Sequence, residues 1–445
     1  MLEALNTLLW GPGTLALILG TGAWLTLRTG GFPQRNLGRA LTLSLGREAR
    51  RKGRGGVSPF GSLMTALAST VGTGNIVGVA AALVSGGPGA LVWMELAAFL
   101  GLAAKFAECM LAVKYRHVRR DGTRWGGPMA VMETRLGSAG AVLGRFYALF
   151  ALLMAFAMGA MAQSGALADT FFAAFTLPRW RVGLVTAVLA LAILLGGIRR
   201  IAEISTVLVP VMALLYLGGG LAVILGNLRR LPEALILMLR CAVAPEAALG
   251  GALGIVTRRE ALRWGVARSV FSNEAGLGSA AITAACADTE DPVKQGLISM
   301  TGVFFDTMVI CTVTGLAICC SGTLGTADGA GRPLTGAALT LRAFETVLGP
   351  LAPWLIGVAL GLFAFTSVLG CAVQAETTAS YLLGPGAVRP CRVLYGLAVF
   401  AGAVIPMATV LQLADLANAL MAFPNLVCLL LLSDEIAGEC GRKER

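Results

Sequence analysis

Residues 69–78 read STVGTGNIVG and interrupt an apolar run that covers residues 60–84. The run is otherwise long enough to cross a bilayer as a helix. Gly72 and Gly74, with polar residues beside them, are poor helix formers, since each glycine costs about 1 kcal/mol in a helix interior relative to alanine. Irregular backbone is tolerated at membrane depth where it is buried in protein or lines a wet cavity. The stretch therefore predicts a broken membrane helix with a polar site at the break.

A second interrupted run lies in the other half of the chain. Residues 272–279 read SNEAGLGS between two mostly apolar stretches. An ionised residue such as Glu274 is expensive in a spanning segment and is typical of a functional site. Taken alone, Gly74 and Gly78 could equally mark a tight helix–helix contact. Two interrupted segments in corresponding places of two halves instead indicate the binding site of a secondary transporter.

The composition is that of a polytopic membrane protein. The chain is 56% hydrophobic and 13% charged, against about 25% charged in an ordinary soluble domain. Its net charge of +11 lies largely in short loops beside apolar spans, which is the positive-inside pattern and not that of a nucleic-acid surface. The single histidine, His117, lies in a basic loop, and the ten cysteines show no C-x-x-C spacing. We therefore expect no enzyme, no catalytic residue and no cofactor apart from a coupling ion.

The apolar runs predict an all-α polytopic fold with about eleven transmembrane helices. Residues 1–59 hold a first helix and a loop with eight basic residues and one acid, which places this loop in the cytoplasm. Residues 60–226 and 258–432 are expected to form two five-helix halves of opposite topology. The connection 227–257, with a short interfacial helix, would lie outside, and the tail 433–445 inside. The odd number of helices puts the N-terminus outside a plasma membrane of the bacterial inner-membrane type and the C-terminus in the cytoplasm.

The motifs resemble those of the alanine or glycine:cation symporter family. The family patterns GTGNIxG, GGPGA, KFAExxLAVKYR, SNEAGLGS, SMTGVFxDT and LMAxPN appear at Gly72–Gly78, Gly86–Ala90, Lys105–Arg116, Ser272–Ser279, Ser299–Thr307 and Leu420–Asn425. The resemblance implies a LeuT-like 5+5 inverted repeat preceded by one extra helix. It also implies a symporter in the lipid bilayer that imports a small neutral amino acid, of the alanine or glycine class, with sodium.

The same resemblance implies roles for residues at the breaks. The backbone amides of Thr73 and Gly74 would bind the substrate carboxylate at the positive end of the following half-helix. Asn75 would hold the break or contact a ligand. Further substrate contacts would come from Gln163, Phe271, Gly276, Thr366 and Cys371. Sodium would take its ligands from Ala68, Thr70, Val71, Asn75, Asp306, Thr366 and Ser367.

Two alternatives concern individual side chains of this set. The hydroxyls of Thr366 and Ser367 could instead bond back to their own helix. For Glu274 and Asp306, cation binding, internal pairing and titration all stay open. Lys105 and Glu108, three residues apart near the inner end of a helix, are predicted either to pair with each other or to extend their charged ends toward the membrane surface, and not to form a site.

Two segments depart from the family pattern. Where GWSYYGE is usual, residues 370–376 read GCAVQAE, and where GNMVQxN is usual, residues 159–165 read GAMAQSG. Cys371 therefore replaces an indole, which predicts room for a somewhat larger neutral amino acid. The alternative is that Met161 or another flexible side chain fills the space.

Three other functions are weighed against sodium symport. Proton coupling through Glu274 or Asp306 would replace sodium. A channel would need a continuous lined pore, whereas the polar residues cluster at two breaks. A non-transporting amino-acid sensor is suggested by the altered pocket segments.

Overall fold

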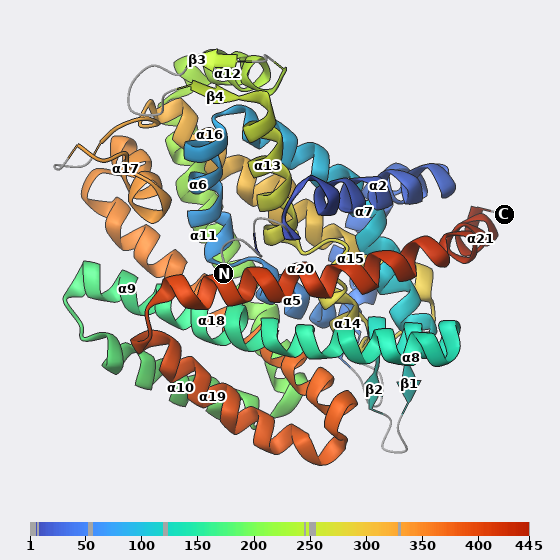
Figure 1. The fold of residues 1–445 in the computed structure, drawn as a ribbon. Helices are drawn as coiled ribbons and strands as arrows, with labels where there is room; N and C mark the ends of the chain where they lie inside the picture. Colours follow the sequence, from blue (N-terminus) through green and yellow to red (C-terminus); the bar gives the residue numbers. More distant parts are fainter. Residues whose placement is uncertain are drawn as a thin grey trace.

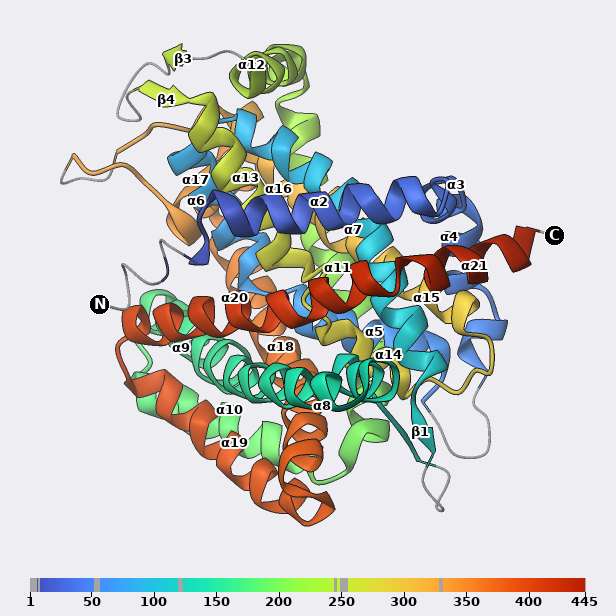
Figure 2. The same ribbon diagram turned by 45° about the vertical axis from the view of Figure 1, so that its right-hand side comes forward.

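The computed structural model describes residues 6, 9–51, 57–118, 123–243, 246–248, 255–327 and 331–444 of the chain, and nearly all of them are helical (Figure 1). Lys52, in the basic loop predicted to be cytoplasmic, lies outside the described residues. Two antiparallel strand pairs lie at opposite ends of the molecule (Figures 1 and 2). They are β1 (His117–Val118) with β2 (Arg124–Trp125), and β3 (Glu246–Ala248) with β4 (Ile255–Thr257).

The first half of the chain begins with one long helix, a group of short ones and a broken pair. These are α2 (Pro12–Arg28), α3 (Phe32–Arg35), α4 (Leu37–Leu45), η1 (Glu48–Arg50), α5 (Pro59–Thr70), η2 (Thr73–Asn75) and α6 (Val77–Gly86). Longer helices follow, one of which contains a π-helical segment. They are α7 (Gly89–Lys114), α8 (Pro128–Met154), the π-helix η3 (Ala155–Ala162), α9 (Gln163–Phe175), α10 (Arg179–Leu194), α11 (Gly197–Gly226), η4 (Leu228–Arg230) and α12 (Leu231–Val243).

The second half also starts with an interrupted helix and contains a π-helical segment. Its elements are α13 (Arg258–Asn273), α14 (Ser279–Ala285), α15 (Pro292–Val303), the π-helix η5 (Phe304–Cys311), α16 (Thr312–Ser321), α17 (Gly336–Leu348) and η6 (Gly349–Leu351). The chain ends with α18 (Ala352–Leu383), η7 (Pro385–Ala387), α19 (Val388–Val404), α20 (Met407–Leu431) and α21 (Ser433–Glu444).

The first predicted break is present as a bend of 62° between α5 and the segment that contains η2 and α6. Helix α5 starts sharply because Pro59 occupies its first turn and the Ser58 side chain accepts a hydrogen bond of 3.0 Å from the Gly61 amide. It ends where the glycine-rich stretch begins. The sequence expectation of a broken helix at this place is therefore confirmed.

The two halves of the chain are intertwined and do not form separate bodies. Helices α8 and α20, which come from different halves, lie side by side, and so do α10 and α19 (Figures 1 and 2). Helix α18 packs directly on α5: a Cβ built on Gly370 would lie 2.4 Å from the Ser69 backbone nitrogen. Such backbone contact through a small residue is typical of packing between membrane helices. It brings the middle of α18 against the first break.

The membrane-spanning character is clear, while the number of spans stays a prediction. Among the described residues, seven helices are long and apolar enough to cross a membrane, or eight if the bent pair counts as one span. The predicted number is eleven. Helices α2, α10 and α13 have 17, 16 and 16 residues, which is fewer than the roughly 20 that a full crossing usually takes.

Candidate functional site

The first break leaves backbone groups of both polarities without helical partners. The Val71 amide still bonds to the Leu67 carbonyl at 2.8 Å, but the Gly72 amide donates instead to Oδ1 of Asn75 at 3.0 Å. Among the described backbone hydrogen bonds outside helices, none ends on a carbonyl oxygen of residues 68–71. Helix ends leave such carbonyls free by geometry. The end of α5 therefore presents oxygen atoms, while the start of η2 presents the amides of Thr73 and Gly74.

A serine hydroxyl from α18 faces this break. Ser367 is fully buried, and its Oγ has no hydrogen-bond partner among the described residues. A Cβ built on Gly72 would lie 2.7 Å from that oxygen. A buried hydroxyl without a partner costs about 1–3 kcal/mol. Ser367 is thus an unsatisfied polar group held directly at the carbonyl end of α5.

Thr366, next to it in sequence, points elsewhere. Its hydroxyl donates to the Leu362 carbonyl at 2.9 Å and to the Phe363 carbonyl at 3.1 Å, and lies 3.2 Å from Sδ of Met212 on α11. Successive side chains on a helix diverge by about 100°. For Thr366 the structure therefore shows the back-bonded arrangement, and only Ser367 faces the break.

The amide side of the break is lined by Gln163 and Phe271. The Thr73 hydroxyl donates to Oε1 of Gln163 at 3.3 Å, and Gln163 is the first residue after the π-helix η3. A Cβ built on Gly74 would lie 3.6 Å from the ring of Phe271. The structure thus brings together Thr73, Gly74, Gln163 and Phe271, four of the predicted substrate contacts.

Asp306 ties the two breaks together from the π-helix η5. Its Oδ1 accepts a hydrogen bond of 2.8 Å from Nδ2 of Asn75 in the first break. Its Oδ2 accepts from the hydroxyls of Ser272, at 2.6 Å, and Thr307, at 2.9 Å. Asn273 beside Ser272 donates in turn to the Thr307 hydroxyl at 3.0 Å. π-helical turns are frequent at functional sites, and this one places a fully buried carboxylate between both interruptions.

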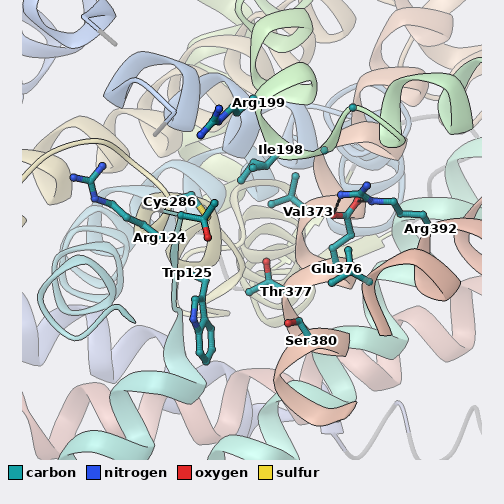
Figure 3. Close-up of a pocket in the computed structure, with 14 residues that line it drawn as sticks. Arg124, Trp125, Ile198, Arg199, Cys286, Val373, Glu376, Thr377, Ser380 and Arg392 are labelled. Atoms are coloured by element: carbon teal, nitrogen blue, oxygen red, sulfur yellow. Dashed lines mark hydrogen bonds and ion pairs between the residues drawn. The ribbon is translucent and has the colours of Figure 1, made fainter. Parts of the chain in front are cut away.

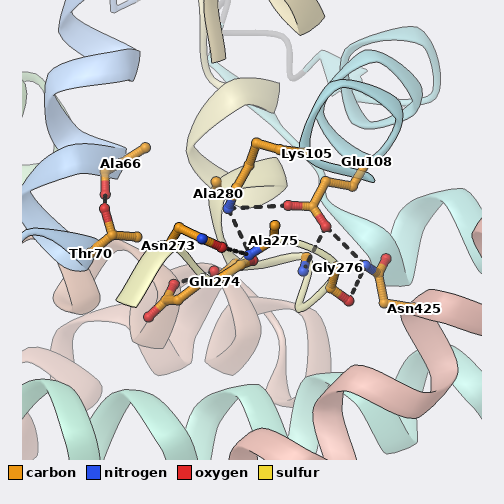
Figure 4. A network of polar contacts seen from close by, with 12 residues as sticks. Ala66, Thr70, Lys105, Glu108, Asn273, Glu274, Ala275, Gly276, Ala280 and Asn425 are labelled. Carbon is orange, nitrogen blue, oxygen red and sulfur yellow. Dashed lines mark hydrogen bonds and ion pairs between the residues drawn. The ribbon is translucent and has the colours of Figure 1, made fainter. Parts of the chain in front are cut away.

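The second break has its own polar support, shown in Figure 4. Glu274 and Gly278 adopt the left-handed conformation, with φ of 53° and 79°. Lys105 Nζ bonds to the Glu274 carbonyl at 3.0 Å and lies 3.3 Å from Oε1 of Glu108. The other oxygen of Glu108 accepts from the Gly278 amide at 3.0 Å. The predicted pairing of Lys105 with Glu108 is confirmed, and the pair supports the irregular backbone.

Asn425 completes this support and is a residue that sequence reasoning did not single out. Its Nδ2 donates to Oε2 of Glu108 at 3.0 Å and to the Gly276 carbonyl at 2.9 Å (Figure 4). Gly276, a predicted substrate contact, is thus held by Asn425, and a Cβ there would lie 2.8 Å from Leu426. In the sequence, the polar amide of Asn425 next to Pro424 in an otherwise apolar helix could have indicated this role.

The remaining predicted cation ligands lie around the first break, and they differ in whether their oxygen atoms already take part in hydrogen bonds. Ala68 and Val71 are buried and belong to the segment whose carbonyls are free. The Thr70 hydroxyl donates to the Ala66 carbonyl at 3.2 Å. The side chains of Asn75 and Asp306 are engaged with each other, as described above.

Comparison with known proteins settles the family. Residues 1–441 match the model of the sodium:alanine symporter family. The chain belongs to this family. It is 40% identical over 444 residues to the sodium/alanine symporter AgcS of Methanococcus maripaludis, covering 99% of this chain and 96% of that protein. It is 36% identical to the probable sodium/glutamine symporter GlnT of Bacillus subtilis, covering 96% and 87%.

A solved structure supports the fold. A manganese transporter of Eremococcus coleocola aligns with a TM-score of 0.51 and 14% sequence identity, over 83% of this chain and 75% of that chain. The sodium:alanine symporter family is a family of transporters. Together with the apolar helices, this makes the chain a multi-pass membrane transporter.

In this symporter the position of Cys371 leaves no enlarged pocket. Cys371 is 2% exposed in an apolar cluster with Tyr395. A Cβ built on Gly159 of η3 would lie 2.2 Å from the Cys371 Cβ. The expectation of extra room at this position is therefore wrong, because the backbone of η3 approaches α18. The Met161 side chain is not what closes the gap; the close contact is made through Gly159.

A separate cavity of about 330 Å³ lies near the C-terminal end of α18 (Figure 3). Glu376 and Arg392 border it and form a bidentate ion pair with two N–O distances of 2.8 Å. Glu376 lies nine residues beyond Ser367, or about 14 Å along the helix axis. Arg124, also at this cavity, pairs with Asp288. The symporter thus has a polar, charged chamber on one side of the break region.

Proposed function

We propose that this protein imports a small neutral amino acid together with sodium, by alternating access around the first break. The observation that carries the proposal is the buried, unpartnered Ser367 hydroxyl at the free carbonyl end of α5. Family membership and the sodium/alanine and sodium/glutamine symporters among its relatives support both ligands. Transporters with discontinuous helices bind anionic groups at half-helix N-termini and cations at unwound carbonyls.

The sodium ion would be held by Ser367 and the carbonyls of Ala68 and Val71. These groups are oxygen atoms, which a hard cation prefers. Occupation by the ion would satisfy the Ser367 hydroxyl, which has no hydrogen-bond partner among the described residues. Thr366 is a weaker candidate because its hydroxyl is already bonded to its own helix.

The amino acid would lie on the other side of the same break. Its carboxylate would accept hydrogen bonds from the amides of Thr73 and Gly74, where the dipole of the following half-helix favours an anion. The Gln163 side chain, whose Oε1 accepts a hydrogen bond from the Thr73 hydroxyl, would bind a polar group of the substrate. The Phe271 ring would cover the bound molecule. We assign the charged chamber at Glu376 and Arg392 to the release path on the opposite side.

Ser367→Ala is expected to raise the half-saturating sodium concentration for uptake about tenfold, equivalent to about 1.4 kcal/mol. The ion would lose a ligand, while alanine suits a helix. The measurement is initial uptake of L-alanine and L-glutamine into proteoliposomes at graded sodium. Thr366→Ala is the matched control, with a smaller expected change because its hydroxyl faces α11. Unchanged sodium dependence in Ser367→Ala would refute the site; uptake that follows a proton gradient without sodium would favour proton coupling.

We further propose that residues 60–226 and 258–432 form inverted halves, with the N-terminus outside and the C-terminus in the cytoplasm. The eight-to-one basic excess of the first loop supports this orientation. A green fluorescent protein fused after Arg445 is expected to fluoresce in bacteria, and alkaline phosphatase fused there is expected to stay inactive. An active phosphatase fusion would show the reverse orientation.

A further inference from the structure

A second cavity of about 330 Å³ lies between α13, α20 and the residues Asn6 and Trp10, which precede α2. Phe271 lines it and also covers Gly74 of the first break. Trp10 closes part of its wall, because its Nε1 donates to the Asp415 carbonyl at 3.0 Å. Its volume falls in the range of about 300–1,000 Å³ that is usual for small-molecule pockets. The cavity therefore adjoins the proposed substrate site, with one aromatic ring between them.

Three charged side chains line this cavity: Arg268 and Asp415, and also Arg263, which is exposed. The Arg268 guanidinium carbon lies 5.3 Å from the centre of the Phe271 ring and 5.5 Å from that of Trp264. Within the described part of the chain, Arg268 forms no ion pair and the Asp415 carboxylate accepts no hydrogen bond. The two groups interact electrostatically across the space. Both side chains are partly buried. Partly buried charges gain from a partner of opposite sign, so a ligand that carries both complementary charges would satisfy both groups.

We propose that this cavity is an outer waiting site for a zwitterionic amino acid, which binds there by its two main-chain charges before it passes Phe271. The inference rests on the proposed function for the identity of the ligand and for the outward orientation of this face. The carboxylate would bind the forked guanidinium of Arg268, and the ammonium group would bind Asp415. A simple anion would be repelled by Asp415 and a simple cation by Arg268, so the pair selects zwitterions.

Recognition at this site would be independent of the amino-acid side chain. The groups assigned to the ligand are the Asp415 carboxylate and the Arg268 guanidinium, which lies against the rings of Phe271 and Trp264. Selection among neutral amino acids would then occur only beyond Phe271. The outer site would raise the local substrate concentration at the closed break.

The first test is binding of glycine to the purified full-length protein in nanodiscs without sodium, followed by tryptophan fluorescence. Trp10 and Trp264 line the cavity and serve as reporters. We expect a saturable change in the parent, at least tenfold weaker binding in Arg268→Gln and Asp415→Asn, and partial recovery in Arg268→Lys. Arg259→Gln, on the same helix but outside this cavity, is the matched control. Methylammonium or acetate alone should produce no such change.

The second test is uptake of L-alanine and L-glutamine by the same variants in proteoliposomes. Arg268→Gln and Asp415→Asn are expected to raise the half-saturating substrate concentration about tenfold, with the maximal rate and sodium dependence unchanged. A lower maximal rate at an unchanged half-saturating concentration would overturn the waiting site and indicate a gate. An unchanged fluorescence response in both variants would also overturn it. Absence of uptake by the parent, with glycine binding still lost in Arg268→Gln, would instead contradict the proposed symport.

Discussion

Asp306→Ala is expected to abolish concentrative uptake and to lower the thermal stability of the purified protein. The Asp306 carboxylate accepts hydrogen bonds from Asn75, Ser272 and Thr307. Its removal leaves the hydroxyls of Ser272 and Thr307 without this acceptor, while Asn75 keeps only its weaker bonds of 3.1 Å to the main-chain carbonyl of residue 306 and to Ser272. Each unsatisfied buried donor costs about 1–3 kcal/mol. Because Asn75 also holds the Gly72 amide, the first break would lose its fixed shape. The measurements are uptake in sealed vesicles and the unfolding temperature in detergent.

Asp306→Asn separates the loss of charge from the loss of contacts. The amide keeps one acceptor oxygen but turns an NH₂ group toward a donor, so we expect a smaller loss of stability than in Asp306→Ala together with a large loss of uptake. Asp169→Ala is the control for removing an acid, because its ion pair with Arg179 is exposed. Normal uptake in Asp306→Asn would show that the carboxylate charge is dispensable and that Asp306 only positions the two breaks.

The breaks themselves were predictable from the sequence because their signals are local. Glycine and polar residues inside an apolar run interrupt a helix wherever that run lies. The pairing of Lys105 with Glu108 was likewise predictable, since residues three apart share a helix face. Each of these inferences needed only a few neighbouring residues and no knowledge of packing.

The direction of individual side chains was not predictable. Thr366 and Ser367 are adjacent hydroxyls, and only the rotation of α18, fixed by its contact with the α5 backbone at Gly370, decides which of them faces the break. The position of Arg268 and Asp415 at the same cavity depends on how α13 and α20 pack. Neither π-helix has a sequence signature, although one contains Asp306 and the other ends at Ala162, directly before Gln163.

Packing also explains why the missing indole misled the sequence interpretation. Replacing a large residue by a small one creates space only if the neighbours stay in place. Here the backbone of η3 approaches α18 closely at Gly159, a position that keeps the family's glycine, and Cys371 is packed against it. Interiors are packed densely, so a smaller side chain does not by itself leave a cavity. The substrate preference of this protein is therefore to be sought around Gln163 and Phe271.

Cys371→Trp is expected to destabilise the protein strongly instead of narrowing its substrate range. A Cβ on Gly159 would already lie 2.2 Å from the Cys371 Cβ, and Tyr395 belongs to the same buried cluster, so an indole has no room. Overpacking of a core costs typically about 1–3 kcal/mol. The measurements are the unfolding temperature and competition by glycine, alanine, serine, valine and leucine, with Cys371→Ser as the control of similar size. A stable Cys371→Trp variant that prefers smaller amino acids than the parent would show that Cys371 lines the substrate pocket after all.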